Sequence, residues 1–501
     1  MPRLLFFIIF VSMKKLWPFI FASFLLASSC QGRIEPVKGE EENPAMSTDA
    51  NPVIPKHWMR AVWIASVRNI DWPKGIYDEQ SQKALYIRYL EHFKSLNINA
   101  VFLQVRPTAD AFYESEYEPW SSYLTGTEGK AAGYDVMRFL IDEAHKRGMQ
   151  FHAWINPYRI DSRTDESQNF KALDSRIPKE WTKDYRTIRI YNPALPEVRE
   201  RIAAIVRELI VRYDVDGVHM DDYFYPDLQK GESMNDDAEF LKYGSGFANI
   251  ADWRRSNVTK MVTTLSNAIS DTRPEVIFSI SPQGNYDNNY NYMFFDTEEV
   301  CRRALIDIII PQLYWSTTAK TDYFTPRLEW FCNRAYSVPV MVGYGVYRFD
   351  GYTDGFKDAS ELLTELNMAD ARSNVTGDIF YNAATVLSNP ININGAIRTK
   401  YSHPALLPEI KKGSKVPSVP SGLTLSGNTL CWNQVEGASN YAIYRSAGDK
   451  QTAELIGTVC PGFGNETPSA SVELASPGVY FVTALNRFNA ESQRSELVLY
   501  K

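Results

Sequence analysis

AVFLQVR at Ala100–Arg106 is followed by YDVMRFLIDEAHKR at Tyr134–Arg147 and then by QFHAWIN at Gln150–Asn156. The two outer runs are short, apolar and rich in β-branched or aromatic residues, which is typical of buried strands. The middle stretch has apolar residues at spacings of three and four, which is typical of an amphipathic helix. Such a strand–helix–strand order predicts parallel strands joined by a helical crossover.

The same order recurs along most of the chain. We count eight strand-like runs: Met59–Ala65, Ala100–Arg106, Gln150–Asn156, Asp216–Tyr223, Val276–Ser281, Asp307–Trp315, Pro339–Tyr344 and Asp378–Asn382. Eight such units predict a closed (β/α)8 TIM barrel over residues 57–411, in the α/β class. The alternative is a doubly wound open sheet, but no G-x-G-x-x-G motif follows the first strand.

The last part of the chain has a different pattern. A Pro/Ser/Gly-rich linker is expected at residues 412–420, and residues 421–501 then alternate apolar and polar positions with period two. Seven short strands are expected, at Leu423–Leu425, Thr429–Trp432, Tyr441–Arg445, Leu455–Val459, Ala470–Leu474, Gly478–Asn486 and Glu496–Tyr500. They predict a small all-β sandwich. The segment resembles a fibronectin type III domain through Trp432 and the strands around Tyr441 and Tyr480, which implies a spacer or a protein-docking surface.

The N-terminal region predicts export. MKKLWPFIFASFLLASSC at Met13–Cys30 has a basic start, an apolar run and small residues before a cysteine. We therefore predict a signal peptide at residues 1–30, starting at Met13, and lipidation of Cys30; ordinary secretion is the alternative. Residues 31–56 are polar and predict a flexible tether. The expected location is the cell envelope, anchored by the lipid and facing the periplasm or the outside.

Charge and cysteine content limit the possible ligands. The net charge is −7 and no Lys/Arg cluster repeats along one face, so we expect no nucleic-acid partner. We also expect no cofactor and no metal, because the only calcium-like spacing, at Asp350, Asp354 and Asp358, lacks the full loop pattern. The remaining cysteines allow two disulfides, Cys301 with Cys332 and Cys431 with Cys460. Free buried thiols are the alternative.

The strongest local signal is DGVHMDDYFYP at Asp216–Pro226. Strand alternation turns Gly217, His219 and Asp221 toward the barrel axis, with Asp221 at the C-terminal end where barrel active sites lie. The same alternation places a polar and aromatic rim on the inner side: Gln104, Arg106, His152, Trp154, Asn156, Ser279, Ser281, Gln312 and Tyr314.

Two adjacent carboxylates followed by aromatic residues favour sugar chemistry. Glycosidic bonds need an acid to protonate the leaving oxygen, and aromatic rings pack against sugar faces. The structural alternatives are that Asp221 pairs with Arg106 and that Asp222 caps the following loop. We expect His219 to be a hydrogen-bonded barrel histidine.

Residues from about Lys56 to Pro408 resemble the family-10-like glycosyl hydrolase lipoproteins, a bacterial group with a (β/α)8 domain that acts on cell-envelope glycans. The segments that carry the resemblance are Arg60–Ile64, Gln104–Pro107, His152–Arg159, Asp216–Pro226, Ser281–Gly284 and Pro311–Trp315. The resemblance implies hydrolysis of peptidoglycan glycan strands, in particular those stripped of peptide, by a membrane-tethered enzyme.

The second catalytic group is not evident from the sequence. Barrel glycosidases hold two carboxylates about 5 to 10 Å apart on different strands, and the other strand ends here offer no second acid. One solution is a carboxylate from a loop after the second or seventh strand, namely Asp110, Glu114 or Asp350. The other is attack by the N-acetyl oxygen of the substrate, which suits the adjacent pair Asp221 and Asp222.

Hydrogen-bonding and stacking residues near the strand ends are expected to contact the substrate: Arg106, Asn156, Tyr158, Arg159, Tyr223, Gln312, Tyr314 and Trp315. For Arg159 a structural ion pair is an equal alternative. Two other functions stay open. One is an inactive, lipid-tethered glycan-binding or scaffold protein, and the other is hydrolysis of a partly deacetylated amino-sugar exopolysaccharide.

Overall fold

The computed structural model describes residues 57–228, 231–411, 413–446, 452–460 and 469–501. Eight parallel strands close into a barrel in the order β1-β11-β10-β9-β8-β7-β3-β2. The strands are β1 Met59–Ile64, β2 Ala100–Arg106, β3 Gln150–Ile155, β7 Gly217–Met220, β8 Ile277–Ile280, β9 Ile308–Ile309, β10 Val340–Tyr344 and β11 Val375–Phe380. Each falls within or overlaps one of the eight predicted runs, and the TIM-barrel prediction is confirmed.

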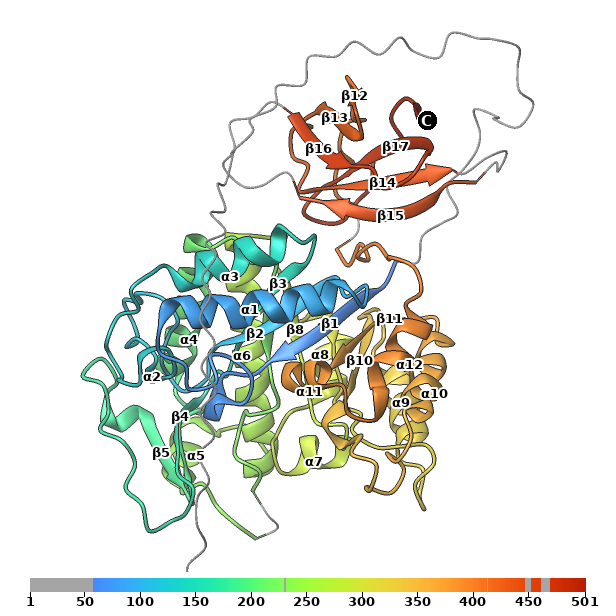
Figure 1. The fold of residues 1–501 in the computed structure, drawn as a ribbon. Helices are drawn as coiled ribbons and strands as arrows, with labels where there is room; N and C mark the ends of the chain where they lie inside the picture. The colour runs from blue at the N-terminus through green and yellow to red at the C-terminus, as the bar shows by residue number, and fades with distance from the viewer. Residues whose placement is uncertain (1–56, 229–230, 412, 447–451, 461–468) are drawn as a thin grey trace, which may run out of the picture.

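Helices surround the barrel (Figure 1). They are α1 Glu79–Lys94, α2 Ser122–Thr125, α3 Val136–His145, α4 Pro196–Arg212, α5 Asp237–Tyr243, α6 Ile250–Thr272, α7 Tyr286–Asn291, α8 Thr297–Arg302, α9 Phe324–Arg334, α10 Ser360–Asp370, α11 Ala383–Ser388 and α12 Ile393–Lys400. Short 3-10 turns add η1 Val67–Asn69, η2 Lys179–Trp181, η3 Val346–Arg348 and η4 Pro390–Asn392. Several helices begin at a side-chain cap; Asp78, for example, accepts a hydrogen bond from Ser81 N at 2.8 Å.

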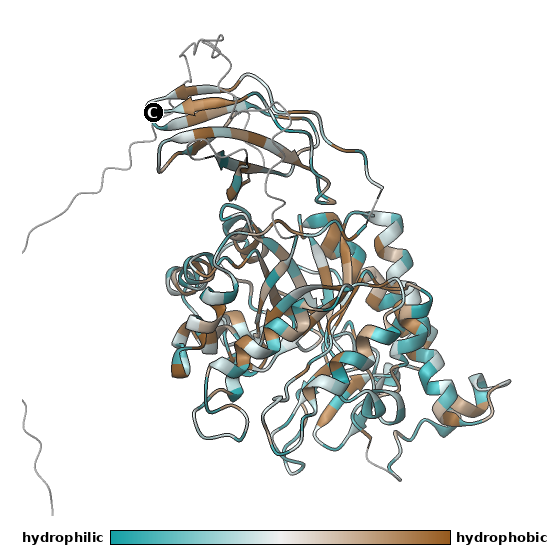
Figure 2. Cartoon of the chain, turned by 90° about the vertical axis from the view of Figure 1, so that its right-hand side faces the viewer, coloured by the Kyte–Doolittle hydropathy of each residue, from teal (hydrophilic) through white to brown (hydrophobic). Residues whose placement is uncertain are grey.

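The apolar residues form two layers. Figure 2 shows the barrel strands, with many apolar positions in brown, surrounded by helices on which brown and teal positions are mixed. The larger layer joins the outward sides of the strands to the helices. The smaller layer fills the barrel interior and includes Ala61, Trp63, Phe102, Trp154 and Ile308. This division follows the period of two along each strand, and it confirms the predicted inward set in β3, β7 and β8.

A small antiparallel sheet follows β3 and was not predicted. Its order is β4-β6-β5, with β4 at Arg159–Ser162, β5 at Thr182–Tyr185 and β6 at Ile188–Tyr191. Each strand has four residues and is partly exposed, so an alternation such as Ile188-Arg189-Ile190 is too short to mark a strand in the sequence. The sheet stands beside the C-terminal ends of the barrel strands and contributes to the candidate site described below.

The C-terminal part is an all-β unit whose described residues form seven strands in two antiparallel sheets, β12-β13-β16 and β15-β14-β17-β18. The strands are β12 Thr424–Ser426, β13 Thr429–Asn433, β14 Asn440–Ser446, β15 Glu454–Val459, β16 Ser469–Glu473, β17 Gly478–Leu485 and β18 Val498–Tyr500. Trp432 and Tyr441 contact each other in the core between the sheets, with ring centroids 5.2 Å apart. The predicted β sandwich is confirmed.

The β unit sits at the N-terminal end of the barrel, away from the C-terminal strand ends (Figure 1). Leu406 packs against Tyr444 and Phe481 of the second sheet. Arg487, in the loop after β17, forms ion pairs with Asp214 and Asp216 just before β7, the second with a separation of 3.0 Å. Apolar packing and charge pairing therefore fix the β unit to the end of the barrel opposite the candidate site.

Other predictions have mixed outcomes. Cys301 and Cys332 are free thiols and do not pair with each other. Among the described residues, no helix combines the length and the apolar character that crossing a membrane requires.

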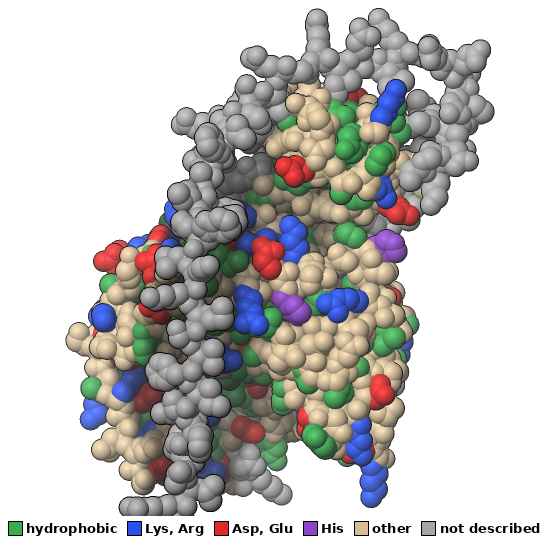
Figure 3. Space-filling model, viewed as in Figure 1, with side chains coloured by type: hydrophobic (Ala, Val, Ile, Leu, Met, Phe, Trp, Pro, Cys, Tyr) green, Lys and Arg blue, Asp and Glu red, His purple; other side chains and the backbone are tan. Residues whose placement is uncertain are grey.

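On the face in Figure 3, basic and acidic side chains are interspersed. The signal peptide, the lipidation of Cys30 and the tether at residues 31–56 lie outside the described residues.

Candidate active site

The C-terminal end of β7 places two acidic side chains side by side. This strand begins at Gly217. Only glycine fits there, because a Cβ atom would lie 2.1 Å from His152 Nδ1. One step along, His219 accepts a hydrogen bond from Trp63 Nε1 at 3.0 Å and contacts Ser279 Oγ through Nδ1 at 2.9 Å. Burial lowers the pKa of His219 well below its usual value, so the imidazole is neutral. His219 is thus the hydrogen-bonded barrel histidine that the sequence predicted.

Asp221 lies above His219 and is held by the third strand. Its carboxylate accepts hydrogen bonds from Asn156 Nδ2 at 2.8 Å and Trp154 Nε1 at 3.2 Å. The side chain is almost fully buried, and burial raises the pKa of Asp221 to about 7. The positive charge of Arg159 opposes this shift, and the negative charge of Asp222 adds to it.

Asp222 is oriented from the flank of β7 that faces away from β3. Gln312 Nε2, which follows β9, donates to Asp222 Oδ1 at 3.1 Å and to Ser281 O at 3.1 Å. Burial raises the pKa of Asp222, and the amides of Gln283 and Gln312 oppose the rise. The pair therefore binds protons as a coupled unit and retains a proton closer to neutral pH than isolated aspartates do.

Both carboxylates open into a cavity of about 360 Å³. Its wall combines the barrel strand ends, the loop after β1 and the small β4-β6-β5 sheet. The lining residues are Trp63, Val67, Arg68, Ile70, Gln104, Trp154, Arg159, Ser162, Thr187, Ile188, His219, Asp221, Asp222, Tyr223, Ser281, Gln312, Tyr314 and Tyr381. Aromatic rings line much of it; those of Tyr314 and Tyr381 stack at 6.0 Å.

Four of the predicted substrate contacts line this cavity: Arg159, Tyr223, Gln312 and Tyr314. The Arg159 guanidinium lies over the Tyr223 ring at 4.2 Å from its centroid. A fifth predicted residue, Asn156, acts from behind the wall. It donates to Asp221 as described above, and its Oδ1 accepts the Arg159 N–H at 2.7 Å. Asn156 therefore connects the carboxylate to the arginine.

Three other predicted contacts lie elsewhere and need correction. Arg106 is buried and bonds to Glu118 and to Asn156 O instead of reaching the cavity or pairing with Asp221. Tyr158 is fully buried in the outer core. Trp315 packs under the Arg327 guanidinium, 4.2 Å from the ring centroid. None of the three lines the cavity.

The proposed loop carboxylates are also outside the cavity. Asp110 is buried and accepts a hydrogen bond from Thr108 N at 2.9 Å. Glu114 is exposed. Asp350 accepts bonds from Tyr352 N and Thr353 N in its own turn, both at 2.7 Å. Asp221 and Asp222 are thus the carboxylates that line this cavity.

Sequence reasoning did not assign several residues that line the cavity. Gln104 Nε2 and Ser281 Oγ are buried and have no hydrogen-bond partner among the described residues. Strand alternation placed both inside, but nothing in the sequence shows that their polar atoms lack partners. Arg68 and Tyr381 come from loops, where no periodic pattern predicts direction. In the described part of the chain, no group of three or more His, Cys, Asp or Glu side chains could hold a metal ion.

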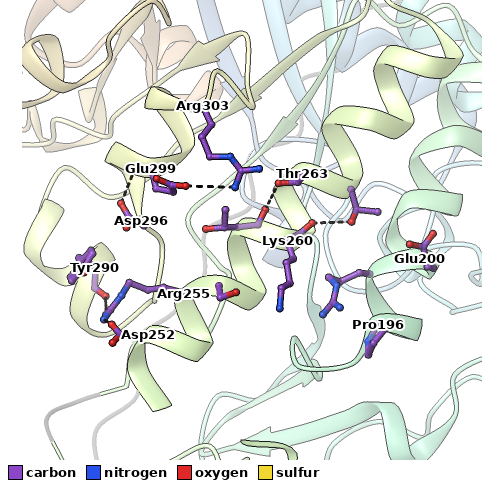
Figure 4. Close-up of a pocket in the computed structure, with 14 residues that line it drawn as sticks. Pro196, Glu200, Asp252, Arg255, Lys260, Thr263, Tyr290, Asp296, Glu299 and Arg303 are labelled. Carbon is purple, nitrogen blue, oxygen red and sulfur yellow. Dashed lines mark hydrogen bonds and ion pairs between the residues drawn. The ribbon is translucent and has the colours of Figure 1, made fainter. Parts of the chain in front are cut away.

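A second, larger pocket of about 620 Å³ lies among α4, α6 and α8, outside the barrel (Figure 4). Two of its arginines are held by neighbouring groups: Arg255 pairs with Asp252 and donates to Tyr290 O at 3.0 Å, and Arg303 lies 3.6 Å from Glu299. The Asp221–Asp222 cavity, although smaller, holds the unpaired donors and the perturbed carboxylates.

The chain is similar to known glycosyl hydrolases. Residues 58–349 match the model of the family described as glycosyl hydrolase-like 10. Glycosyl hydrolase YngK of Bacillus subtilis (strain 168) is 35% identical over 475 residues, which cover 87% of this chain and 92% of that protein. Glycosyl hydrolase DigH of Escherichia coli (strain K12) is 31% identical over 404 residues, covering 71% of this chain and 90% of that protein.

Among solved structures, the chain matches the glycoside hydrolase domain of PgaB (BpsB) from Bordetella bronchiseptica with a TM-score of 0.48 and 11% identity, over 68% of this chain and 98% of that one. The family model spans more than half of the chain and includes Asp221 and Asp222. The chain belongs to the glycosyl hydrolase-like 10 family.

Proposed function

We propose that the protein hydrolyses the glycan strands of peptidoglycan, which carry N-acetyl groups, and that Asp221 and Asp222 perform the chemistry. The observation that carries the proposal is the pair itself: two adjacent, buried carboxylates with raised pKa values at the floor of an aromatic-lined cavity. A carboxyl group with a pKa near 7 suits proton transfer at neutral pH. The family assignment supports action on a glycosidic bond.

The adjacency of the two groups favours substrate assistance. The acetamide oxygen of the sugar attacks its own anomeric carbon while the bond from that carbon to the leaving oxygen breaks. Asp221 gives its proton to the leaving oxygen, and Asp222 accepts a hydrogen bond from the acetamide N–H. Water then gives a proton back to Asp221 and adds to the anomeric carbon, which regenerates the acetamide. The anomeric configuration is retained.

The contacts around each carboxylate support these separate roles. Asp221 is held toward β3 by Trp154 and Asn156, and Asp222 is held toward β9 by Gln312. The two groups therefore face different parts of the same bound sugar. Gln104 Nε2 and Ser281 Oγ, which have no hydrogen-bond partner in the described part of the chain, add donors and an acceptor for hydroxyl or carbonyl groups.

We also propose that the mature chain is tethered through Cys30 and that the β unit is a fibronectin type III-like spacer. The two-sheet order supports the second point. Because the β unit is fixed to the N-terminal end of the barrel, the cavity faces away from it. A tether at residues 31–56 would let this face reach glycan strands in the cell envelope.

The test uses residues 31–501 without lipid and two substrates, peptide-free glycan strands and the same strands after chemical N-deacetylation. Soluble fragments are measured by mass analysis. We expect cleavage of the acetylated strands and at least a 100-fold slower reaction after deacetylation, because the acetamide is the nucleophile. Equal cleavage of both substrates excludes substrate assistance. Cleavage of the deacetylated strands alone assigns the enzyme to a deacetylated polymer.

A further inference from the structure

A pair of buried glutamates lies on α10, outside the candidate active site. Glu361 is 4% exposed and Glu365 is 1% exposed. They are four residues apart, on the helix face that also buries Leu362 and Leu366. Neither forms an ion pair within 4.0 Å with a basic side chain in the described part of the chain. Two ionised carboxylates in such a place would repel each other, and burying them without a cation is costly.

One proton shared between the two side chains removes this conflict. Glu361 accepts bonds from Thr317 N at 2.5 Å, Thr317 Oγ1 at 2.7 Å and Thr318 Oγ1 at 2.9 Å, which suits an ionised carboxylate. Glu365 is hydrogen-bonded to Glu361. Burial and the negative charge of Glu361 raise the pKa of Glu365 well above its usual value. Glu365 is therefore the carboxylic acid of the pair and donates its proton to Glu361.

The loop that Glu361 holds continues directly from the wall of the cavity. We call residues 312–318 the wall segment. At its start, Gln312 donates to Asp222, and Tyr314 lines the cavity. Its last two residues are the donors to Glu361. Glu361 therefore anchors the far end of the wall segment.

The near end of the wall segment is anchored by an arginine. Arg348 in η3 donates to Tyr314 O, and its guanidinium lies 4.6 Å from the centroid of the Phe356 ring. Among the residues that the structure describes, its guanidinium forms no ion pair within 4.0 Å. Its positive charge opposes the rise in the pKa of Glu365. An ionised Glu365 would therefore attract Arg348 away from Tyr314 O.

Two further titratable groups face Glu365 from other elements. Asp322, in the loop before α9, adds to the rise in the pKa of Glu365. Tyr344 on β10 is buried, and Glu365 contributes to the raised pKa of its hydroxyl. This hydroxyl donates to Asp378 at 2.8 Å. Of the groups whose charges act on Glu365 here, Arg348 is the cation that can respond to its ionisation.

We propose that Glu361 and Glu365 hold one proton between them at neutral pH and thereby position the wall segment, and that loss of this proton to alkaline solvent releases the segment. The two carboxylates then repel each other, and Arg348 is drawn from Tyr314 O toward Glu365. Because both anchors weaken together, Gln312 and Tyr314 lose their fixed positions beside the reacting groups. The glutamates and the arginine are thus positioning residues. The inference extends the proposed function to its control by pH and rests on that function for the effect on catalysis.

The direction of the pH effect follows from Glu365. Its pKa in the folded chain is higher than the unfolded value of about 4.3. Its contribution to folding is complete below about pH 4 and is lost as pH rises through the raised pKa. Glu365→Gln keeps a donor for Glu361 and cannot ionise, so it should hold the wall segment at alkaline pH. Above the pKa, each pH unit should raise the opening of the segment in wild type by up to about 10-fold.

Amide hydrogen exchange of residues 31–501 between about pH 6 and 9.5 tests the proposal on peptides that cover the wall segment. Wild type, Glu365→Gln and the control Glu197→Gln, an exposed position on α4, are compared at each pH so that the intrinsic pH dependence of exchange cancels. At the highest pH, wild type and the control should exchange at least about 10-fold faster than Glu365→Gln. Near the lowest pH the three should agree. Arg348→Gln should exchange faster around Tyr314 at every pH.

Thermal unfolding at the lowest pH shows whether Glu365→Gln folds, and Glu365→Met, an apolar substitute of similar length, takes its place if it does not. Equal exchange in wild type and the substituted chain at every pH overturns the inference. A difference that does not extend to Tyr314 also overturns it. Both outcomes leave the proposed hydrolysis standing, and the exchange result is independent of whether wild type cleaves glycan.

Steady-state kinetics on peptide-free strands then test the link to catalysis. KM should rise with pH in wild type and stay level in Glu365→Gln, because the wall segment is released in wild type alone. In both enzymes kcat should fall alike, because Asp221 titrates in both. A KM that rises equally in the two enzymes contradicts the link between the glutamate pair and the cavity.

Discussion

Asn156 Nδ2 donates a hydrogen bond to Asp221 Oδ1 at 2.8 Å. The same amide accepts the Arg159 N–H through Oδ1 at 2.7 Å. A side chain behind the cavity wall thus positions both the proposed proton donor and Arg159, which lines the cavity. Asn156 is therefore a positioning residue, and its loss should disturb the orientation of both Asp221 and Arg159.

Asn156→Ala should lower kcat/KM on peptide-free strands by roughly 100-fold, since the orientation of Asp221 and Arg159 would no longer be fixed. Removing this donor from the carboxylate should also raise the apparent pKa of the acid, and the alkaline limb of the pH–rate profile should move up. Steady-state kinetics from pH 5 to 9 measure both effects. An unchanged profile with an unchanged rate would show that Asn156 has no positioning role.

The pH dependence of the wild-type enzyme follows from Asp221. Burial raises the pKa of Asp221 to about 7, so the protonated form needed for acid catalysis is lost as pH rises through about 7. We expect kcat/KM to fall above this pH. In Asp222→Asn any residual activity should show this fall at lower pH, because the neighbouring negative charge that raises the pKa of Asp221 is gone. A shift to higher pH would contradict the coupling.

Replacing Asp221 should lower the activity but raise the stability of the fold at alkaline pH. The pKa of Asp221 is higher in the folded chain than the unfolded value of about 3.9, so folding is favoured by the bound proton. This contribution is complete below about pH 4 and is lost as pH rises toward 7. Asp221→Asn should therefore raise the free energy of unfolding at pH 8 relative to wild type, by up to about 4 kcal/mol.

Thermal unfolding at pH 4 and pH 8 checks this expectation. The stabilisation by Asp221→Asn should appear at pH 8 and be small at pH 4. Asp350→Asn, at an exposed carboxylate outside the cavity, is the matched control and should show no stabilisation at pH 8. Destabilisation by Asp221→Asn at pH 8 would mean that Asp221 is not a strained acid.

Gly217→Ala should disturb the barrel floor. The added Cβ would meet His152 Nδ1 at 2.1 Å, and His152 is itself stacked on Phe102 at 4.1 Å. We expect a loss of about 1 to 3 kcal/mol in unfolding free energy, as for other overpacked cores. Chemical denaturation measures it. Gly231→Ala, where a Cβ would meet nothing within 4 Å but the backbone φ is +87°, separates steric clash from backbone strain.

The contact between the barrel and the β unit should be sensitive to acid. Burial alone would raise the pKa of Asp216, but His145 and Arg487 hold it well below its usual value. The pKa of His145 is raised by Asp216 against the effect of burial. The Asp216 contribution is present above about pH 4 and lost below it, whereas that of His145 is present below about pH 6.5 and lost as pH rises through its raised pKa.

Arg487→Ala should therefore weaken docking of the β unit at any pH above about 4, where the Asp216 contribution is present, and no less at higher pH, where His145 loses its charge and Arg487 remains beside Asp216. Calorimetry should show one transition splitting into two, or the β unit unfolding earlier, with glycan cleavage unchanged because the cavity lies at the far end. Arg445→Ala, on β14 and outside the Asp214–Asp216 contact, is the control. An identical trace for Arg487→Ala and wild type would show that the ion pairs do not hold the two parts together.

Strand alternation predicted much of the site, since the period of two fixes which side chains point inward once one strand is oriented. Gln104, Asp221 and Gln312 were placed in this way. The alternation failed at Arg106, where the pairing register of β2 and β3 shifts between Gln104 and Arg106. The guanidinium instead meets Glu118, a loop residue that no periodic pattern identifies.

The remaining errors come from loops. Arg68 has a positive φ of 54° in a short 3-10 turn, so its direction follows from local geometry that the sequence does not specify. The β4-β6-β5 sheet depends on contacts between strands of four residues, too short for a hydrophobic pattern. These two features complete the wall of the cavity and give it the positive charge.

The most direct test of the central claim is fragment release from peptide-free glycan strands by residues 31–501, comparing wild type with Asp221→Asn and with the control Asp350→Asn. We predict soluble fragments from wild type and the control. In Asp221→Asn we predict at least a 1,000-fold loss of rate, because the amide has nearly the shape of the carboxyl group but lacks its acidic proton. Fragment release by Asp221→Asn at the wild-type rate, or binding of strands without release by any of the three proteins, would contradict a hydrolase centred on Asp221.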